Sequence, residues 1–107
     1  MAIHRFEVYL VSLDLTTGYE IKKTRPCIII SPDEMNKYIK TVIIAPLTSK
    51  RRAYLTRIPI IFAGKEGEIV LDQIRTVDKS QLVECLGKID DSIAKEITKI
   101  LLEMFAE

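Results

Sequence analysis

Arginine, hydroxyl and carboxylate side chains lie at the ends of three apolar segments of this chain. Arg25 comes at the start of the first segment, and Thr48 and Ser49 come at the end of the second. Asp72 and Arg75 follow the third. If the three segments are strands of one barrel, their ends can gather these side chains at a single site.

A phosphodiester is the substrate that suits this set of side chains. The guanidinium of Arg25 offers a planar fork of donors for two phosphate oxygens and stays charged. The hydroxyls of Thr48 and Ser49 can hydrogen-bond a phosphate oxygen or a ribose 2′-OH. In metal-free RNA cleavage the 2′-OH attacks the adjacent phosphorus, so an enzyme needs donors where negative charge grows. On residue types alone, a surface salt bridge for Arg25 and a plain strand-end hydroxyl for Thr48 are the commoner roles.

Other catalytic chemistries have little support in the sequence. His4 is the single histidine, and Cys27 and Cys85 have no partner at metal-ligand spacing, so we expect neither a metal nor a cofactor. The chain has no glycine-rich nucleotide loop and no G-x-S-x-G motif. Both cysteines lie in apolar segments and are expected to be free, buried thiols.

Length and composition are typical of one ordinary globular domain, residues 1–107. Hydrophobic residues make up 48% of the chain and charged residues 29%, which excludes a disordered protein. The longest apolar runs, Cys27–Ile30 and Val42–Pro46, are too short to cross a bilayer, and no signal-peptide core opens the chain. We therefore expect a soluble cytoplasmic protein without membrane contact.

The net charge of +1 hides an asymmetry between the two halves. Residues 1–64 carry ten Lys/Arg against five Asp/Glu, and residues 65–107 carry six against ten. Basic clusters occur at Lys22–Arg25 and Lys50–Arg52. Such clusters can form a path for RNA or can be solvated loops, and charge alone does not distinguish the two.

The pattern of apolar residues predicts strands followed by one helix. Strands are expected at Phe6–Leu13, Cys27–Ser31, Thr41–Thr48, Leu55–Phe62, Glu68–Ile74 and Gln81–Ile89. Pro46 indicates that its strand lies at a sheet edge or carries a bulge, because proline cannot donate to a ladder. Short strands at this spacing favour a small, strongly bent barrel over βαβ units.

The C-terminal residues change to a helical period. Ile93, Ile97, Ile100, Leu101, Met104 and Phe105 recur at three- and four-residue steps. Asp90, Asp91 and Ser92 are N-cap candidates for this helix. We expect the apolar face to cover the barrel and complete the core.

Several short motifs occur in order along the chain. They are L-D-L-T-T-G-Y-E at 13–20, T-R-P at 24–26, S-P-D at 31–33, P-L-T-S at 46–49 and D-Q-I-R-T-V-D at 72–78. In this order and spacing they resemble the motifs of the MazF/PemK family of toxin endoribonucleases. The family usually has a proline where this chain has Leu15.

This resemblance implies a fold, an activity and partners. The fold is mainly β, a small SH3-like (CcdB/PemK-type) barrel with a C-terminal α-helix, and members are usually homodimers. The activity is that of a type II toxin, a sequence-specific endoribonuclease that cleaves single-stranded mRNA without metal. The products carry a 2′,3′-cyclic phosphate and a 5′-hydroxyl. The RNA groove would also accept the acidic C-terminal tail of a cognate antitoxin.

The resemblance also assigns roles to residues. Arg25 and Thr48 fall where the MazF branch has its principal catalytic pair. The PemK/Kid branch instead uses a histidine and an arginine, and these positions are Tyr19 and Val70 here. RNA binding is implied for Glu20, Tyr19, Ser49, Lys50, Arg51, Arg52, Asp72 and Arg75.

Alternatives remain open for some roles and for the function. Asp72 and Arg75 could form a salt-bridged scaffold, and Tyr19 or Tyr54 could lie in the core instead of stacking on bases. The function could be that of a CcdB-like toxin that inhibits DNA gyrase by protein binding, without catalysis, or that of an SH3-like interaction module. The matches at Arg25 and Thr48 argue against the CcdB-like function, and an interaction module does not need this set of strand-end side chains.

Overall fold

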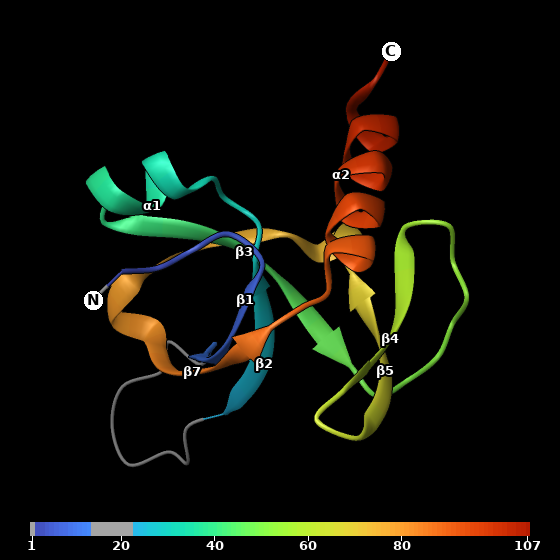
Figure 1. Ribbon diagram of the computed structural model, residues 1–107, viewed down its shortest axis with the longest axis horizontal. Coiled ribbons are helices and arrows are strands. Elements are labelled where there is room, and N and C mark those ends of the chain that lie inside the picture. The colour runs from blue at the N-terminus through green and yellow to red at the C-terminus, as the bar shows by residue number, and fades with distance from the viewer. Residues whose placement is uncertain (1, 14–22) are drawn as a thin grey trace.

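The computed structural model describes residues 2–13 and 23–107, and its strands form a curled antiparallel sheet (Figure 1). The strands are β1 (Glu7–Ser12), β2 (Thr24–Ile29), β3 (Thr41–Thr48), β4 (Arg57–Phe62), β5 (Lys65–Val70), β6 (Arg75–Asp78) and β7 (Leu82–Lys88). The helices are α1 (Asp33–Tyr38) and α2 (Asp91–Phe105), with 3₁₀ turns η1 (Leu71–Gln73) and η2 (Lys79–Gln81). This half-barrel with a C-terminal helix confirms the mainly β fold class expected from the sequence.

The strand β3 joins the two parts of the sheet, whose order is β4-β5-β3-β2-β1-β7. On one side β3 pairs with β2. On the other side it pairs first with β6, through Ile44, and then with β5, from Leu47. Pro46 lies between these two partners. The prediction that this strand lies at a sheet edge is therefore wrong. Proline has no N–H to donate, and Pro46 is accommodated inside the sheet because it lies at the point where β3 changes from one partner to the other.

The core consists of two apolar clusters on opposite faces of the sheet, because successive strand residues alternate between faces. One cluster contains Ile3, Tyr9, Val11, Cys27, Ile29, Val42, Ile44, Val77 and Leu82. The other contains Val8, Ile28, Ile30, Ala45, Ile58, Ile69, Leu71, Ile89 and Ile97. Ile97 of α2 is fully buried there, so the helix completes the core as expected. Phe105, assigned to the same helix face, is instead 69% exposed.

Short elements account for the other differences from the sequence prediction. The helix α1 was not predicted, because its six residues are too few to show a helical period. The strand expected at Glu68–Ile74 is β5 followed by η1, and the four-residue β6 comes after it.

Cys27 is buried as expected, but Cys85 on β7 is exposed. Among the described residues, no helix is long and apolar enough to span a membrane.

A two-residue turn connects β4 to β5. Phe62 pairs with Lys65, and the intervening Ala63 and Gly64 have φ angles of 52° and 78°. Positive φ at both central residues is the mark of a type I′ turn, whose twist matches that of a hairpin. Within this hairpin β5 pairs with the end of β3, through Ile69 with Leu47 and Glu68 with Thr48.

Candidate functional site

Arg25 and Thr48 lie on neighbouring antiparallel strands. Cys27 of β2 pairs with Pro46 of β3, and the same register continued by two residues sets Arg25 opposite Thr48. On its other side Thr48 pairs with Glu68 of β5. The sheet thus brings together the two residues that the sequence singled out as a catalytic pair.

Arg25 and Thr48 share an open pocket of about 580 Å³. Its polar lining residues are Thr24, Arg25, Thr48, Ser49, Lys50, Lys65 and Glu66. Ile60 and Phe62 from β4 and Leu86 from β7 also line it. Three cations and one carboxylate make the pocket net positive, so an anion with an adjoining flat or apolar group suits it.

The Thr48 hydroxyl is oriented by the chain that follows it. Its Oγ1 accepts a hydrogen bond from the N–H of Lys50 at 3.2 Å, which leaves the hydroxyl hydrogen free to donate. The backbone of Gly67 on β5 lies against Thr48, and a Cβ at Gly67 would be 2.3 Å from the Thr48 carbonyl oxygen. Only glycine allows this approach, so Gly67 fixes the position of the strand end.

Arg25 is exposed at the rim of the pocket. Across residues 2–13 and 23–107, no carboxylate lies within ion-pair distance of its guanidinium. The donors of Arg25 therefore face the pocket without a protein carboxylate to occupy them in this part of the chain.

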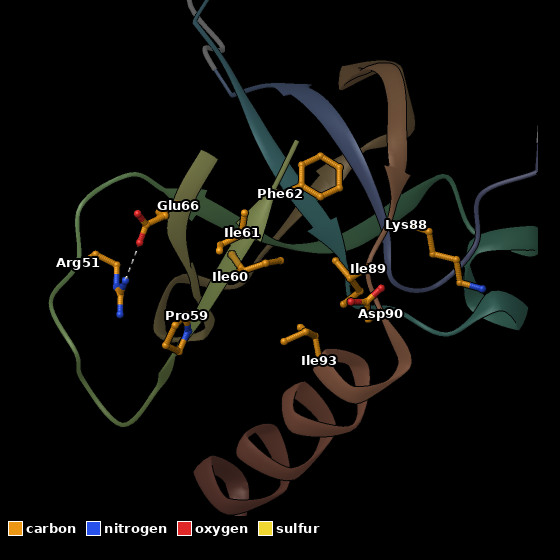
Figure 2. Close-up of a pocket in the computed structure, with 10 residues that line it drawn as sticks. All are labelled: Arg51, Pro59, Ile60, Ile61, Phe62, Glu66, Lys88, Ile89, Asp90 and Ile93. Carbon is orange, nitrogen blue, oxygen red and sulfur yellow. Dashed lines mark ion pairs between the residues drawn. The ribbon is translucent and has the colours of Figure 1, made fainter. Parts of the chain in front are cut away.

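A second pocket, of about 460 Å³, adjoins the first along the β4–β5 hairpin (Figure 2). Ile60, Phe62 and Glu66 line both pockets. Arg51 lies at the rim of this second pocket, with its Nη1 3.7 Å from Oε1 of Glu66. Ile93, at the start of α2, also lines this pocket. Residues 50–52, the basic segment after β3, therefore reach both pockets: Lys50 lines the first pocket and Arg51 lines the second.

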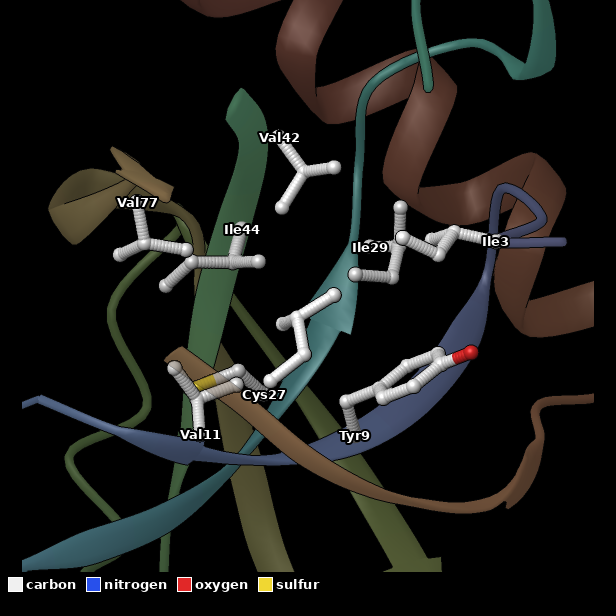
Figure 3. Close-up of a cluster of buried hydrophobic side chains, with 9 residues drawn as sticks. Ile3, Tyr9, Val11, Cys27, Ile29, Val42, Ile44 and Val77 are labelled. Atoms are coloured by element: carbon white, nitrogen blue, oxygen red, sulfur yellow. The ribbon is translucent and has the colours of Figure 1, made fainter. Parts of the chain in front are cut away.

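Cys27, two residues after Arg25 on β2, lies within the first apolar cluster (Figure 3). Its Sγ donates to the backbone carbonyl of Arg25 at 3.5 Å. Burial raises the pKa of the Cys27 thiol to about 12, although the charges of Arg25 and Arg75 oppose the rise. The thiol stays protonated at neutral pH, so it packs in the core and is not a nucleophile.

Asp72 lies outside the pocket and has a structural role. Its carboxylate accepts hydrogen bonds from Arg57 Nε at 3.1 Å, Arg57 Nη2 at 3.2 Å and the Thr56 hydroxyl at 2.9 Å. The Arg57 guanidinium holds the pKa of Asp72 below its ordinary value, and the Thr56 hydroxyl adds to this. The same guanidinium lies 4.9 Å from the ring centroid of Tyr54, which is 57% exposed and not in the core.

The five side chains of the sequence prediction thus do not all meet at one pocket. Arg75 pairs with Ile44 of β3, four residues before Thr48, and does not line the pocket. Asp72 follows β5, and β5 runs antiparallel to β3, so its end points away from Thr48. Tyr19 and Glu20 lie outside the described residues. Arg25, Thr48 and Ser49 are the three that the fold brings together.

Glu68 belongs to this region but was not singled out from the sequence. It is fully buried on β5, and its carboxylate accepts the N–H groups of Arg52 and Ala53. The N–H of Arg52, followed by that of Ala53, lowers the pKa of Glu68 against the effect of burial. The signal in the sequence is a glutamate directly before the apolar run Ile69–Leu71, where a charge needs partners.

Within the described part of the chain, no group of three His, Cys, Asp or Glu residues could hold a metal ion.

A family model for the PemK-like, MazF-like toxin of type II toxin–antitoxin systems matches residues 4–105. The chain belongs to this family. It is 35% identical over 105 residues to the Endoribonuclease MazF of Staphylococcus saprophyticus, which covers 92% of this chain and 88% of that protein. The expectation drawn from the short motifs is thereby confirmed.

Solved structures of similar proteins have the same fold. An endoribonuclease from a Mycobacterial species in complex with its cognate antitoxin has a TM-score of 0.80 and 26% identity, over 95% of this chain and 93% of that chain. A MazE-MazF structure from Deinococcus radiodurans has a TM-score of 0.83 over 97% and 96% of the two chains. Its identity is 20%, so it supports the fold alone.

Proposed function

We propose that this toxin is a sequence-specific endoribonuclease that cleaves single-stranded mRNA. The observation that carries the proposal is the placement of Arg25 opposite Thr48 at the rim of an open pocket with net positive charge. The similarity to a protein named Endoribonuclease MazF supports it. Ser49 and Lys50 line the same pocket and are the proposed contacts to the RNA backbone.

In the proposed reaction the ribose 2′-OH attacks the adjacent phosphorus, so that a 2′-O–P bond forms as the P–O5′ bond breaks. The 2′-OH loses its proton and the departing 5′ oxygen gains one, which leaves a 2′,3′-cyclic phosphate and a 5′-hydroxyl. The forked guanidinium of Arg25 binds two phosphate oxygens, where negative charge grows in the transition state. The Thr48 hydroxyl, whose hydrogen is not used by the bond from the Lys50 N–H, donates to a phosphate oxygen or positions the 2′-OH. The nucleophile comes from the substrate and Arg25 supplies the positive charge at the phosphate, so we expect no metal requirement.

The proposed partners follow from the charge of the site. An antitoxin with an acidic C-terminal tail would compete with RNA for Arg25 and Lys50, and the solved complex of a similar endoribonuclease with its antitoxin supports such a partner. We further propose that residues 1–107 form a single toxin domain that acts as a homodimer. Since mRNA is the substrate, the cytoplasm is its proposed compartment.

The direct test is incubation of the purified protein with a long RNA in EDTA, followed by primer extension to map the cuts. We expect cuts at one short sequence motif, with 5′-hydroxyl ends. A strict requirement for Mg²⁺, or products with 5′-phosphates, would contradict the proposed reaction. Growth arrest without any RNA cleavage would favour a protein target such as DNA gyrase instead.

A further inference from the structure

Glu68 links the strand that carries Thr48 to the basic segment that follows it. Glu68 is 0% exposed, and its backbone pairs with Thr48 across the β3–β5 ladder. Its carboxylate reaches the segment between β3 and β4, where Oε1 accepts the N–H of Arg52 at 3.0 Å and Oε2 that of Ala53 at 2.9 Å. One side chain therefore joins the end of β3 to the middle of the basic segment.

The geometry is that of a specific clamp. A buried carboxylate is strongly unfavourable unless hydrogen bonds satisfy its oxygens, and here each oxygen takes a backbone N–H. Arg51 Nε lies 3.6 Å from Oε2 and adds a positive charge. Ala53 has a φ of 58°, a left-handed conformation that a non-glycine residue holds only where its surroundings impose it.

The rest of the segment is held near its ends. The N–H of Lys50 bonds to the Thr48 hydroxyl at 3.2 Å, and the hydroxyl of Thr56 bonds to Asp72 at 2.9 Å. Between these two points the amides of Arg52 and Ala53 both donate to Glu68. The clamp thus determines where the backbone of the basic segment runs past the pocket.

We propose that Glu68 is a positioning residue for RNA binding, which holds the backbone of residues 50–52 so that Lys50 lies at the Arg25–Thr48 pocket and Arg51 at the adjoining one. The inference rests on the proposed RNA cleavage. Contacts to phosphates fix the register of a nucleic acid on a protein, so basic side chains on an ordered backbone bind the strand better than the same charges on a mobile loop. Glu68 touches no RNA itself, because it is fully buried.

The test compares Glu68→Gln with Glu66→Gln. Glutamine has one acceptor oxygen, so its NH₂ group faces one of the two amides and that bond is lost. Glu66 contacts the same Arg51, at 3.7 Å, but neither amide, so its variant removes a charge and leaves the clamp intact. The measurements are kcat and KM on a short RNA, and amide hydrogen exchange at Arg52 and Ala53.

For Glu68→Gln we expect KM to rise about tenfold or more, kcat to change less than about threefold, and both amides to exchange faster. For Glu66→Gln we expect KM to fall, since a carboxylate leaves the pocket wall, and amide exchange to stay as in the wild type. A wild-type KM for Glu68→Gln despite faster exchange would overturn the proposal. So would an equal change in KM for both variants, because charge alone would then explain it.

Two further measurements keep the test decisive. If Glu68→Gln does not fold, Glu68→Asp is measured in its place. Aspartate keeps the charge but is one methylene too short to reach both amides, so we expect the same rise in KM. A folded Glu68→Asp with wild-type KM would contradict the proposal. If the wild-type protein cleaves no RNA, the proposed function fails, whereas amide exchange in the two glutamine variants still shows whether Glu68 holds the segment.

Discussion

Arg25 and Thr48 contribute different donors to the proposed cleavage site. Arg25 supplies a permanent charge and a planar fork from an exposed position on β2. Thr48 supplies one hydroxyl hydrogen, whose direction is restricted by the bond from the Lys50 N–H. We therefore expect Arg25 to stabilise the negative charge of the transition state and Thr48 to orient the phosphate or the 2′-OH. Substitutions at each position can separate these roles.

Arg25→Ala should lower kcat for RNA cleavage by about a hundredfold or more, the usual loss when one preorganised donor is removed. Arg25→Lys should restore little, because a point charge cannot bind two oxygens at once. Arg25 is exposed, so the Tm of both variants should stay close to that of the wild type. Single-turnover cleavage and thermal unfolding measure these effects, and near-wild-type cleavage by the alanine variant would place the catalytic centre elsewhere.

Thr48→Val keeps the shape and the β-branch of the side chain but removes the hydroxyl. Cleavage should slow by about tenfold or more while stability barely changes, because Lys50 is exposed and water can accept from its N–H. Thr48→Ser should retain more activity than Thr48→Val. An equal loss in the two variants would indicate that the methyl group matters and that the hydroxyl does not act in the reaction.

At the scale of elements, the β4–β5 hairpin fixes the end of β3. Its turn residues have the positive φ angles of a type I′ connection, and its glycine at position 67 lies against the Thr48 carbonyl. The two glycines of the hairpin are needed for different reasons. Gly64 is needed for its conformation, and Gly67 for the space beside β3.

Gly67→Ala should displace Thr48, because the new Cβ would lie 2.3 Å from the Thr48 carbonyl oxygen and the strand must move. We expect both stability and kcat to fall. Gly64→Ala is the control, since nothing lies within 4 Å of its Cβ, but its φ of 78° makes alanine unfavourable by about 1–2 kcal/mol. It should lower the Tm and leave cleavage at its wild-type rate at 25 °C, as urea unfolding and kinetics can establish. Full activity in folded Gly67→Ala would show that the strand end tolerates the shift.

The elements also explain which parts of the structure could be predicted from sequence. The β-branched run at Thr41–Thr48 and the helical period after Asp91 are local patterns, and both elements are present at nearly the expected bounds. The partner change of β3 at Pro46 depends on tertiary pairing, which no local pattern encodes. The contact of Asp72 with Arg57 depends on the pairing of β4 with β5, which sets Arg57 opposite Val70, so the sequence could not separate Asp72 from the pocket.

At the scale of the whole molecule, several carboxylates stabilise loops and turns by accepting backbone or side-chain donors. Asp33 accepts the N–H of Arg5, Asp78 accepts that of Ser80, and Asp72 accepts from Arg57. At each of these carboxylates the named hydrogen bond is the largest cause of a lowered pKa. The pKa of Glu68 is likewise lowered most by the hydrogen bond from the N–H of Arg52. The folded state therefore favours the charged form at all four positions.

Acid should destabilise the protein through these carboxylates. Their folded pKa values lie below the ordinary 3.8 for aspartate and 4.5 for glutamate, so the unfolded chain takes up protons first as the pH falls. The free energy of unfolding should be steady above about pH 5 and should fall as the pH drops through 4 and below. Urea midpoints between pH 2 and pH 7 test this, and Glu68→Gln should show a shallower decline than the wild type. A midpoint that does not change over this range would contradict the assignment.

RNA and the acidic tail of the antitoxin should exclude one another, because both are proposed to use the positive charge of Arg25 and Lys50. A synthetic tail should inhibit RNA cleavage competitively, and both ligands should bind more weakly at 300 mM than at about 50 mM salt. The measurement is cleavage titrated with the tail at the two salt concentrations. Binding of the tail at full cleavage activity would mean that inhibition, if any, acts from another face.

The unequal environments of the two cysteines make the protein ready for selective labelling. Cys27 is enclosed in the core with a thiol pKa of about 12, so a maleimide dye should not react there while the protein is folded. Cys85 is exposed and precedes Leu86, which lines the Arg25–Thr48 pocket. Successive strand residues alternate between faces, so a single fluorophore on Cys85 of the unmutated chain would stand on the opposite face of β7 from Leu86, near Glu7 of β1. Its emission there could report in real time whether a ligand in the pocket alters this edge of the sheet.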